Sequence, residues 1–206
     1  VLLDLGRGAN RLGGSALAQA CGQTGDRVPD MDSAADLKSF FTLVQELLAR
    51  GEVLAYHDRS DGGLLVTLLE MAFAGRCGLQ VDLSGLAGNM LDKLFNEEVG
   101  AVLQIAIVEL EIFRSRAIAL GLRDCLHVIG QAQSGDTVSV MNGAQEILRD
   151  SRARLQQLWA RTSYEIQALR DHPDCAREEY ERHTADDPGL SAALAYDATA
   201  DISAPF

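Results

Sequence analysis

The residues with the clearest chemical potential lie in one short segment, Ala55–Leu64. There an apolar stretch ends, polar residues gather, and two glycines, Gly62 and Gly63, open a helical pattern. Glycines let the backbone approach a ligand closely, and the free N–H groups and dipole of a helix N-terminus favour an anion. The segment therefore predicts a phosphate-binding turn.

Two acids in this turn determine what a phosphate would need there. Asp58 and Asp61 repel a phosphate directly, so we expect a magnesium ion between carboxylate and phosphate oxygens, because Mg²⁺ prefers hard oxygen ligands. Ser60 offers a hydroxyl to the phosphate or caps the helix, and Asp61 competes with it for the capping role. The alternative is a capped strand-to-helix turn in which Asp58 is simply exposed to solvent.

A second glycine-rich turn, Gly6–Ser15, also lies between a predicted strand and a predicted helix. It does not match the dinucleotide-binding pattern, because Arg11 stands where the third glycine is needed. One interpretation is a loop whose glycines permit close helix packing and whose Ser15 caps the helix. The other adds Arg7 and Arg11 as clamps for an anion.

A third segment, Leu94–Gly100, contains the adjacent acids Glu97 and Glu98. Adjacent acids point to different sides of an element, so a general acid–base pair is a poor interpretation. Glu97 can reach a metal or hold a loop, but a solvated turn is the simpler expectation. The sequence has no Gly-x-Ser-x-Gly elbow and no comparable cysteine site, so we predict no catalytic residue in it.

The composition restricts the class of protein. The chain has 206 residues, 47% hydrophobic and 23% charged, with a formal net charge of −12. This describes a globular chain whose charge repels nucleic acids and anionic membranes. The four cysteines have no metal-binding spacing, which predicts a reducing, cytoplasmic location, and Cys21 is expected to be a small buried side chain.

Apolar strand-like and helical segments alternate up to about residue 130, which predicts an α/β (α+β) fold with a mixed sheet layered with helices. We expect strands at Val1–Leu5, Val53–His57, Leu79–Leu83, Ala101–Ile107, Leu126–Gln131 and Thr137–Met141, the last two joined by a tight turn at Ser134–Asp136. We expect helices at Ser15–Ala20, Ala34–Arg50, Gly63–Ala74, Met90–Phe95 and Glu109–Leu120.

The pattern changes after Asp150. Ser151–Arg170 has helical periodicity and Trp159 is expected to anchor it, while Asp174–His183 predicts a second, exposed helix. From Thr184 onward the chain is typical of a linker. We therefore divide the chain into a lobe at residues 1–150 and a helical arm with an extended linker at residues 151–206. The N-terminus is typical of a strand entered mid-chain, which predicts a piece of a larger protein.

Several motifs together resemble a known superfamily. The motif His57–Leu64 resembles that of the C-terminal lobes of the aminoimidazole ribonucleotide synthetase superfamily. Within this superfamily, the order of the motifs in the chain is similar to that of the large single-chain formylglycinamide ribonucleotide amidotransferases. These enzymes are also called phosphoribosylformylglycinamidine synthases. The segments that carry this resemblance are Asp4–Leu17, Leu94–Glu98, Thr162–Tyr164 and Ala185–Leu190.

The resemblance implies a specific place and function. The chain would be the second synthetase-type C-terminal lobe and its connector to a glutaminase domain beyond Phe206. The whole enzyme would use ATP and glutamine to convert formylglycinamide ribonucleotide into the formylglycinamidine ribonucleotide. By the same resemblance, Asp58 would bind Mg²⁺, Ser60 would contact ATP or ADP, and this nucleotide would be structural. The chain alone would be inactive, because the adjacent ATP-binding lobe and the glutaminase residues lie outside it.

Two alternatives stay open. One is another ATP-dependent member of the same superfamily, such as an aminoimidazole ribonucleotide or selenophosphate synthetase, although the long arm after Asp150 argues against it. The other is a non-catalytic scaffold or docking domain, in which the turn at Asp58 only caps a helix and the arm binds a partner. Magnesium-dependent nucleotide binding distinguishes this scaffold from the ligase.

Overall fold

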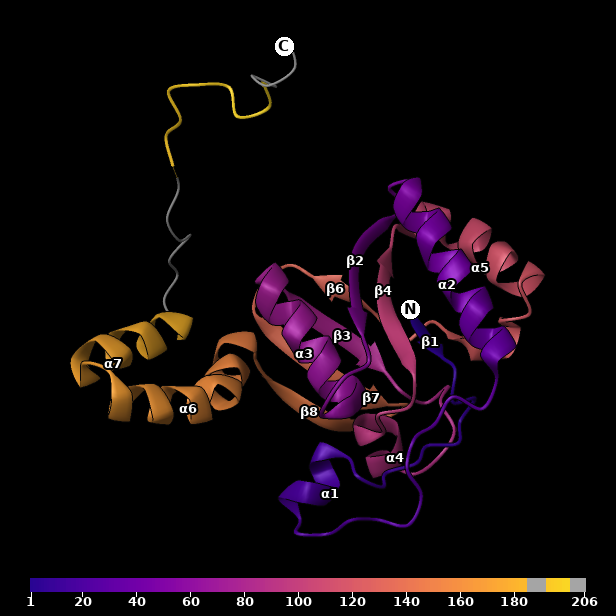
Figure 1. Cartoon of the computed structure of the whole chain (residues 1–206), viewed down its shortest axis with the longest axis horizontal. Coiled ribbons are helices and arrows are strands. Elements are labelled where there is room, and N and C mark those ends of the chain that lie inside the picture. The colour runs from indigo at the N-terminus through magenta and orange to yellow at the C-terminus, as the bar shows by residue number, and fades with distance from the viewer. Residues whose placement is uncertain (185–191, 201–206) are drawn as a thin grey trace.

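Two four-stranded sheets with flanking helices form the body of the protein, and a pair of helices extends from it (Figure 1). The computed structural model describes residues 1–184 and 192–200. The strands are β1 (Leu2–Asp4), β2 (Val53–Asp58), β3 (Gly78–Asp82), β4 (Gly100–Ile105), β5 (Leu126–His127), β6 (Gly130–Gln133), β7 (Thr137–Asn142) and β8 (Gln145–Ser151). The helices are α1 (Ala16–Ala20), α2 (Ala34–Ala49), α3 (Gly63–Gly75), α4 (Met90–Phe95), α5 (Leu110–Ala119), α6 (Arg152–Arg170) and α7 (Pro173–Glu181). The predicted mixed α/β class is confirmed.

The first sheet has the order β2-β4-β1-β5 and is antiparallel throughout. Its two central strands are buried on both faces, because successive side chains of a strand point to opposite sides. Leu3 faces a core formed with α2 and α5, whereas Leu2 faces a second core formed with α3 and the second sheet. This two-sided burial explains the continuous apolar runs of β1 and β4.

The second sheet has the order β6-β3-β7-β8, with β3 parallel to β7 and antiparallel to β6. The predicted β6–β7 hairpin is therefore wrong, because β3 lies between the two strands. The connection at 134–136 instead crosses the end of β3 at Gly78. A Cβ at Gly78 would lie 2.5 Å from the carbonyl oxygen of Thr137, so only glycine leaves room for this crossing.

Other differences from the predicted elements occur where strands end or lie at an edge. The strand expected at Leu126–Gln131 is divided between the two sheets as β5 and β6. The strand expected at Ala101–Ile107 ends at Ile105, and a 3₁₀ turn follows at Ile107–Glu109. Strand β8 was not predicted, because it is an edge strand with polar residues on both sides. Helix α4 has the predicted bounds.

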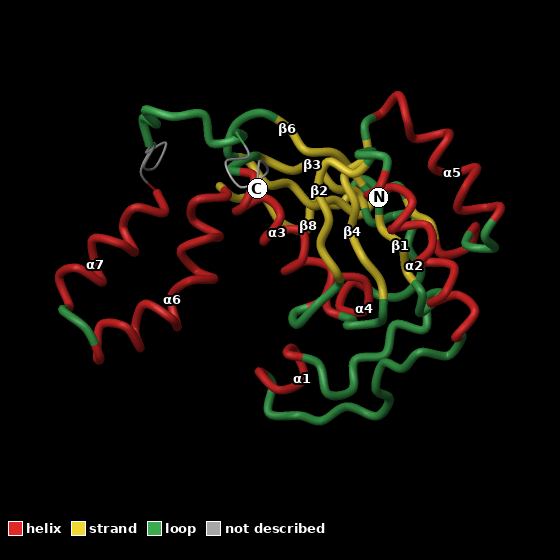
Figure 2. The backbone as a smooth tube through the Cα atoms, turned by 45° about the horizontal axis from the view of Figure 1, so that its top comes forward, coloured by secondary structure: helices red, strands yellow, loops and turns green. Residues whose placement is uncertain are grey.

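Helices α6 and α7 pack against each other and project away from the two sheets, as Figures 1 and 2 show. The Tyr164 and Tyr180 rings stack between them with centroids 4.4 Å apart. Trp159 of α6 packs on Phe73 of α3, with ring centroids 5.8 Å apart. No helix within residues 1–184 is long and apolar enough to cross a bilayer. The motif at Ala185–Leu190 and the last residues of the expected linker lie outside the described residues.

Candidate functional site

Asp58 and Ser60 lie at the end of β2, where this edge strand turns into α3. The Asp58 side chain is 72% exposed, and its carboxylate has one ion-pair contact within residues 1–184 and 192–200, to His57 Nδ1 at 3.7 Å. The backbone of Ser60 donates to the buried Thr67 hydroxyl at 3.4 Å. The turn thus presents an open carboxylate on an anchored backbone.

A series of side-chain contacts joins the end of β2 to α3 and α6. His57 Nδ1 lies 2.7 Å from the carbonyl oxygen of Asp58, and His57 Nε2 lies 3.0 Å from Glu70 Oε2 on α3. Trp159 Nε1 of the arm donates to the other oxygen of Glu70 at 2.9 Å. The arm, α3 and the turn at Asp58 are therefore connected through Glu70.

The glycine pair is not arranged as the sequence predicted. Gly62, which has no side chain, is the N-cap residue of α3 with φ +87°, so neither Ser60 nor Asp61 has the expected capping role. Glu97 Oε1 accepts the N–H of Gly62 at 2.8 Å and the N–H of Ala16, at the start of α1, at 2.8 Å. A carboxylate of the chain itself therefore occupies the anion position that the sequence assigned to a phosphate.

Gly63 has a packing role. A Cβ on it would lie 2.6 Å from the backbone carbon of Phe95, and its φ is +70°. The start of α3 can approach the end of α4 closely because this residue has no side chain. Glu97, expected in a solvated turn, follows directly after that contact and bridges the two helix starts.

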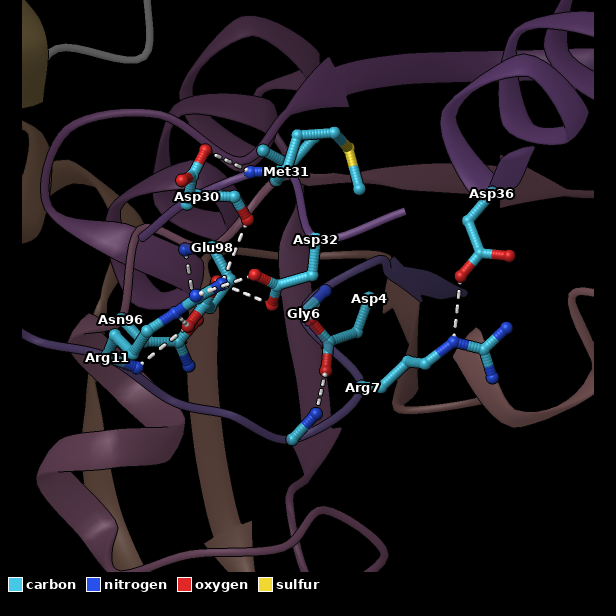
Figure 3. A network of polar contacts seen from close by, with 12 residues as sticks. Asp4, Gly6, Arg7, Arg11, Asp30, Met31, Asp32, Asp36, Asn96 and Glu98 are labelled. Atoms are coloured by element: carbon cyan, nitrogen blue, oxygen red, sulfur yellow. Dashed lines mark hydrogen bonds and ion pairs between the residues drawn. The ribbon is translucent and has the colours of Figure 1, made fainter. Parts of the chain in front are cut away.

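The first glycine-rich turn is closed by two ion pairs, of which Arg11–Glu98 is buried and Arg7–Asp36 is more exposed (Figure 3). Arg11 Nη2 lies 2.7 Å from Glu98 Oε2, and this guanidinium also contacts Asp32. Arg7 Nε donates to Asp36 at 2.8 Å, and this contact holds the pKa of the Asp36 carboxyl below its usual range. Both arginines are engaged by carboxylates of the chain, so the packing interpretation of this turn holds rather than the anion clamp.

Arg59, between the two predicted site residues, is a structural residue that the sequence reasoning missed. Its side chain is 1% exposed, and its guanidinium donates to Asp4 Oδ1 at 2.5 Å and to the Glu98 carbonyl at 2.5 Å. Asp4 also accepts the backbone N–H groups of Gly6 and Gly8. An aspartate inside an apolar strand was the available signal, because a buried carboxylate requires a partner.

All four cysteines are free. Cys21 is exposed, so the expectation that it is buried is wrong. Burial raises the pKa of the Cys125 thiol to about 11, which keeps it protonated and unreactive.

Comparison with known proteins identifies the fold. Residues 1–142 match the family of AIR synthase related proteins, C-terminal domain. The chain therefore belongs to this family. It is similar in fold to solved structures from Thermotoga maritima, at 16–18% sequence identity.

Three of these structures define the similarity. PurL complexed with ATP has a TM-score of 0.53 and 17% identity, over 60% of this chain and 22% of that one. PurL complexed with FGAR has a TM-score of 0.51 and 18% identity, over 57% and 20%. Phosphoribosylformylglycinamidine synthase II has a TM-score of 0.51 and 16% identity, over 60% and 22%. The matched region thus spans about a fifth of each relative.

Proposed function

We propose that this chain is a lobe of the purine-biosynthesis ligase that converts formylglycinamide ribonucleotide, ATP and glutamine into the formylglycinamidine ribonucleotide. The family match over residues 1–142 supports this assignment, as do solved relatives that hold ATP or FGAR. In this proposal residues 1–150 form the second synthetase-type C-terminal lobe of the large single-chain type. Residues 151–206 connect it to a glutaminase domain, and the enzyme is cytoplasmic.

The observation that carries the site assignment is the exposed carboxylate of Asp58, which stands two positions before Ser60 and its hydroxyl. The side-chain oxygens of Asp58 and Ser60 fit Mg²⁺, which commonly takes one or two carboxylates, water and substrate phosphates as ligands. Within residues 1–184 and 192–200, no group of three or more His, Cys, Asp or Glu side chains is placed to hold a metal. The remaining ligands would therefore come from the nucleotide, water and an adjacent ATP-binding lobe.

When bound, the magnesium ion would neutralise phosphate charge. Asp58 would hold it, and Ser60 would contact the nucleotide. The His57–Glu70 contact would keep the end of β2 in place, because it fixes the backbone on which Asp58 stands. We assign this nucleotide, ATP or ADP, a structural role in joining lobes.

The test is magnesium-dependent binding of ATP and ADP to the protein that the native reading frame encodes, measured by isothermal titration calorimetry. We expect Asp58→Asn to weaken binding at least about 10-fold, since a charge-assisted contact is lost. Ser60→Ala should weaken it by about 3-fold to 10-fold, the loss of one hydrogen bond. Asp61→Asn is the matched control, because Asp61 is exposed and does not cap α3.

The outcomes separate the candidate functions. Binding that Asp58→Asn leaves unchanged would remove the metal role of Asp58. No magnesium-dependent binding at all would favour a scaffold domain instead. The exposed apolar side chains Leu158, Ile166 and Leu169 of α6 are the observation in favour of that scaffold.

A further inference from the structure

A cavity of about 140 Å³ lies beside β1 and β5, apart from the candidate site. Neither Asp58 nor Ser60 lines it. Its walls come from β1 and the turn after it, from the loop at Gly85–Ala87 and from α4. Arg59 and Lys93 line it although both are buried, which is unusual for cations and requires a physical explanation.

Arg59 has one nitrogen left for a ligand. Its Nε and Nη2 donate to Asp4 and to backbone carbonyls, whereas Nη1 has no hydrogen-bond partner in the described part of the chain. No fully buried side-chain nitrogen or oxygen there lacks a partner, so Nη1 must reach accessible space. The cavity is the accessible space that Arg59 lines.

Lys93 carries a buried charge without an ion pair among the described residues. Its side chain is 7% exposed, and Nζ donates to the Leu83 carbonyl at 3.0 Å and to Asn142 Oδ1 at 2.9 Å. Both acceptors are neutral, so one N–H of the ammonium remains for a ligand. Asp82 lies near enough for Lys93 to lower its pKa, but Asp82 Oδ1 accepts the backbone N–H groups of Ser84 and Gly143.

The acids and the histidine of the cavity do not cancel this charge. Asp4 is paired with Arg59 and with two backbone N–H groups. Asp124 is 77% exposed and lies 3.6 Å from Arg7. Burial lowers the pKa of His127, which disfavours its charged form. Among the charged residues that line the cavity, Lys93 is therefore the cation without an acidic partner.

We propose that this cavity binds a phosphate-type oxyanion, free or as the end group of a small metabolite, through Lys93 Nζ and Arg59 Nη1. An anion would compensate the buried ammonium, and charge-assisted hydrogen bonds from Lys and Arg are the usual means of holding phosphate. The volume is about ten times what one water molecule requires, which accommodates a phosphate group. Gly8 and Ala87, which line the cavity, are both exposed, so this part of its wall lies at the surface of the protein.

The chain offers a matched pair of variants, because Lys38 and Lys93 are its only lysines and Lys38 is exposed on α2. We would titrate the protein with inorganic phosphate by calorimetry, with chloride holding the ionic strength constant. Saturable binding is expected, and Lys93→Gln should weaken it at least about 10-fold. Lys38→Gln should leave it unchanged.

A second variant keeps the test decisive if Lys93→Gln fails to fold. Ala87→Phe places a large side chain at the exposed part of the cavity wall without removing a charge and should also abolish phosphate binding. Absence of saturable binding to the wild type, or binding that survives both variants, would overturn the proposal.

Two further measurements identify the ligand and separate this site from the magnesium site. Tighter binding of glycerol 3-phosphate than of phosphate would identify the end group of a metabolite, and equal binding would identify free phosphate. Asp58→Asn should leave phosphate binding unchanged, whether or not that variant affects nucleotide binding.

Discussion

The turn after β1 and the turn after β2 both contain a glycine pair and arginine, yet their charged residues are arranged differently. In the first turn, Arg7 and Arg11 contact carboxylates of the chain. In the second, Arg59 is buried against Asp4 while its neighbour Asp58 is exposed. A glycine-rich turn with charged residues is therefore not by itself a ligand site, and the carboxylate left open is the one that merits a functional test.

The largest expected effect comes from removing Glu98, the carboxylate that pairs with Arg11 of the first turn, and it contrasts with removal of the exposed carboxylate of Asp58. Glu98→Gln should lower the free energy of unfolding by about 3–5 kcal/mol, because it leaves a buried guanidinium without its ionic partner. Asp58→Asn should change it by less than about 0.5 kcal/mol, as expected for an exposed side chain. Urea unfolding followed by circular dichroism measures both, and equal losses would contradict the contrast between the turns.

A smaller effect is expected from glycine substitutions that test packing. Gly63→Ala should cost about 2–3 kcal/mol, because it adds a backbone clash with Phe95 to the strain of a positive φ. Gly51→Ala is the control, since its φ is +66° but no atom lies within 4 Å of the added Cβ, and about 1 kcal/mol is expected. If thermal and urea unfolding give the same cost for both, close packing at Gly63 is not the reason for that glycine.

The smallest of these effects concerns the shared carboxylate at the two helix starts. Glu97→Ala should cost about 1–2 kcal/mol, the usual loss when a helix N-terminal N–H group loses its acceptor. Amide hydrogen exchange should become faster in the first turns of both α1 and α3. Glu165→Ala on exposed α6 is the control, and faster exchange in only one helix would show that Glu97 does not serve both.

The elements were largely predictable because their signals are local. The spacing of apolar residues predicts helix α4, and glycines near the C-termini of α2 and α3 predict where these two helices end. The neighbours of β6 were not predictable, since the chain crosses β3 instead of turning back on itself. Strand β8 lacked the alternation of a half-buried strand, because it lies at an edge.

The position of the candidate site was predictable from the sequence, but the contacts around it were not. The sequence located the turn at Asp58, because apolar, acidic and glycine residues follow each other there. It did not show that Glu97 fills the helix starts, since Ala16 and Gly62 come together only in three dimensions. Arg59 was missed because its partner Asp4 lies 55 positions away in the chain.

The bridging by Glu97 also constrains the order of events during synthesis. Its two hydrogen bonds reach back 81 and 35 positions, and β4, directly after it, pairs with both β1 and β2. A nascent chain that ends before Glu97 has neither the acceptor for these helix starts nor the strand that joins the two earlier ones. Contacts of such long range form slowly, and β1 and β2 have no partner strand until β4 follows them, so both leave the ribosome unpaired. The first sheet can close only after β4 and β5 have been made.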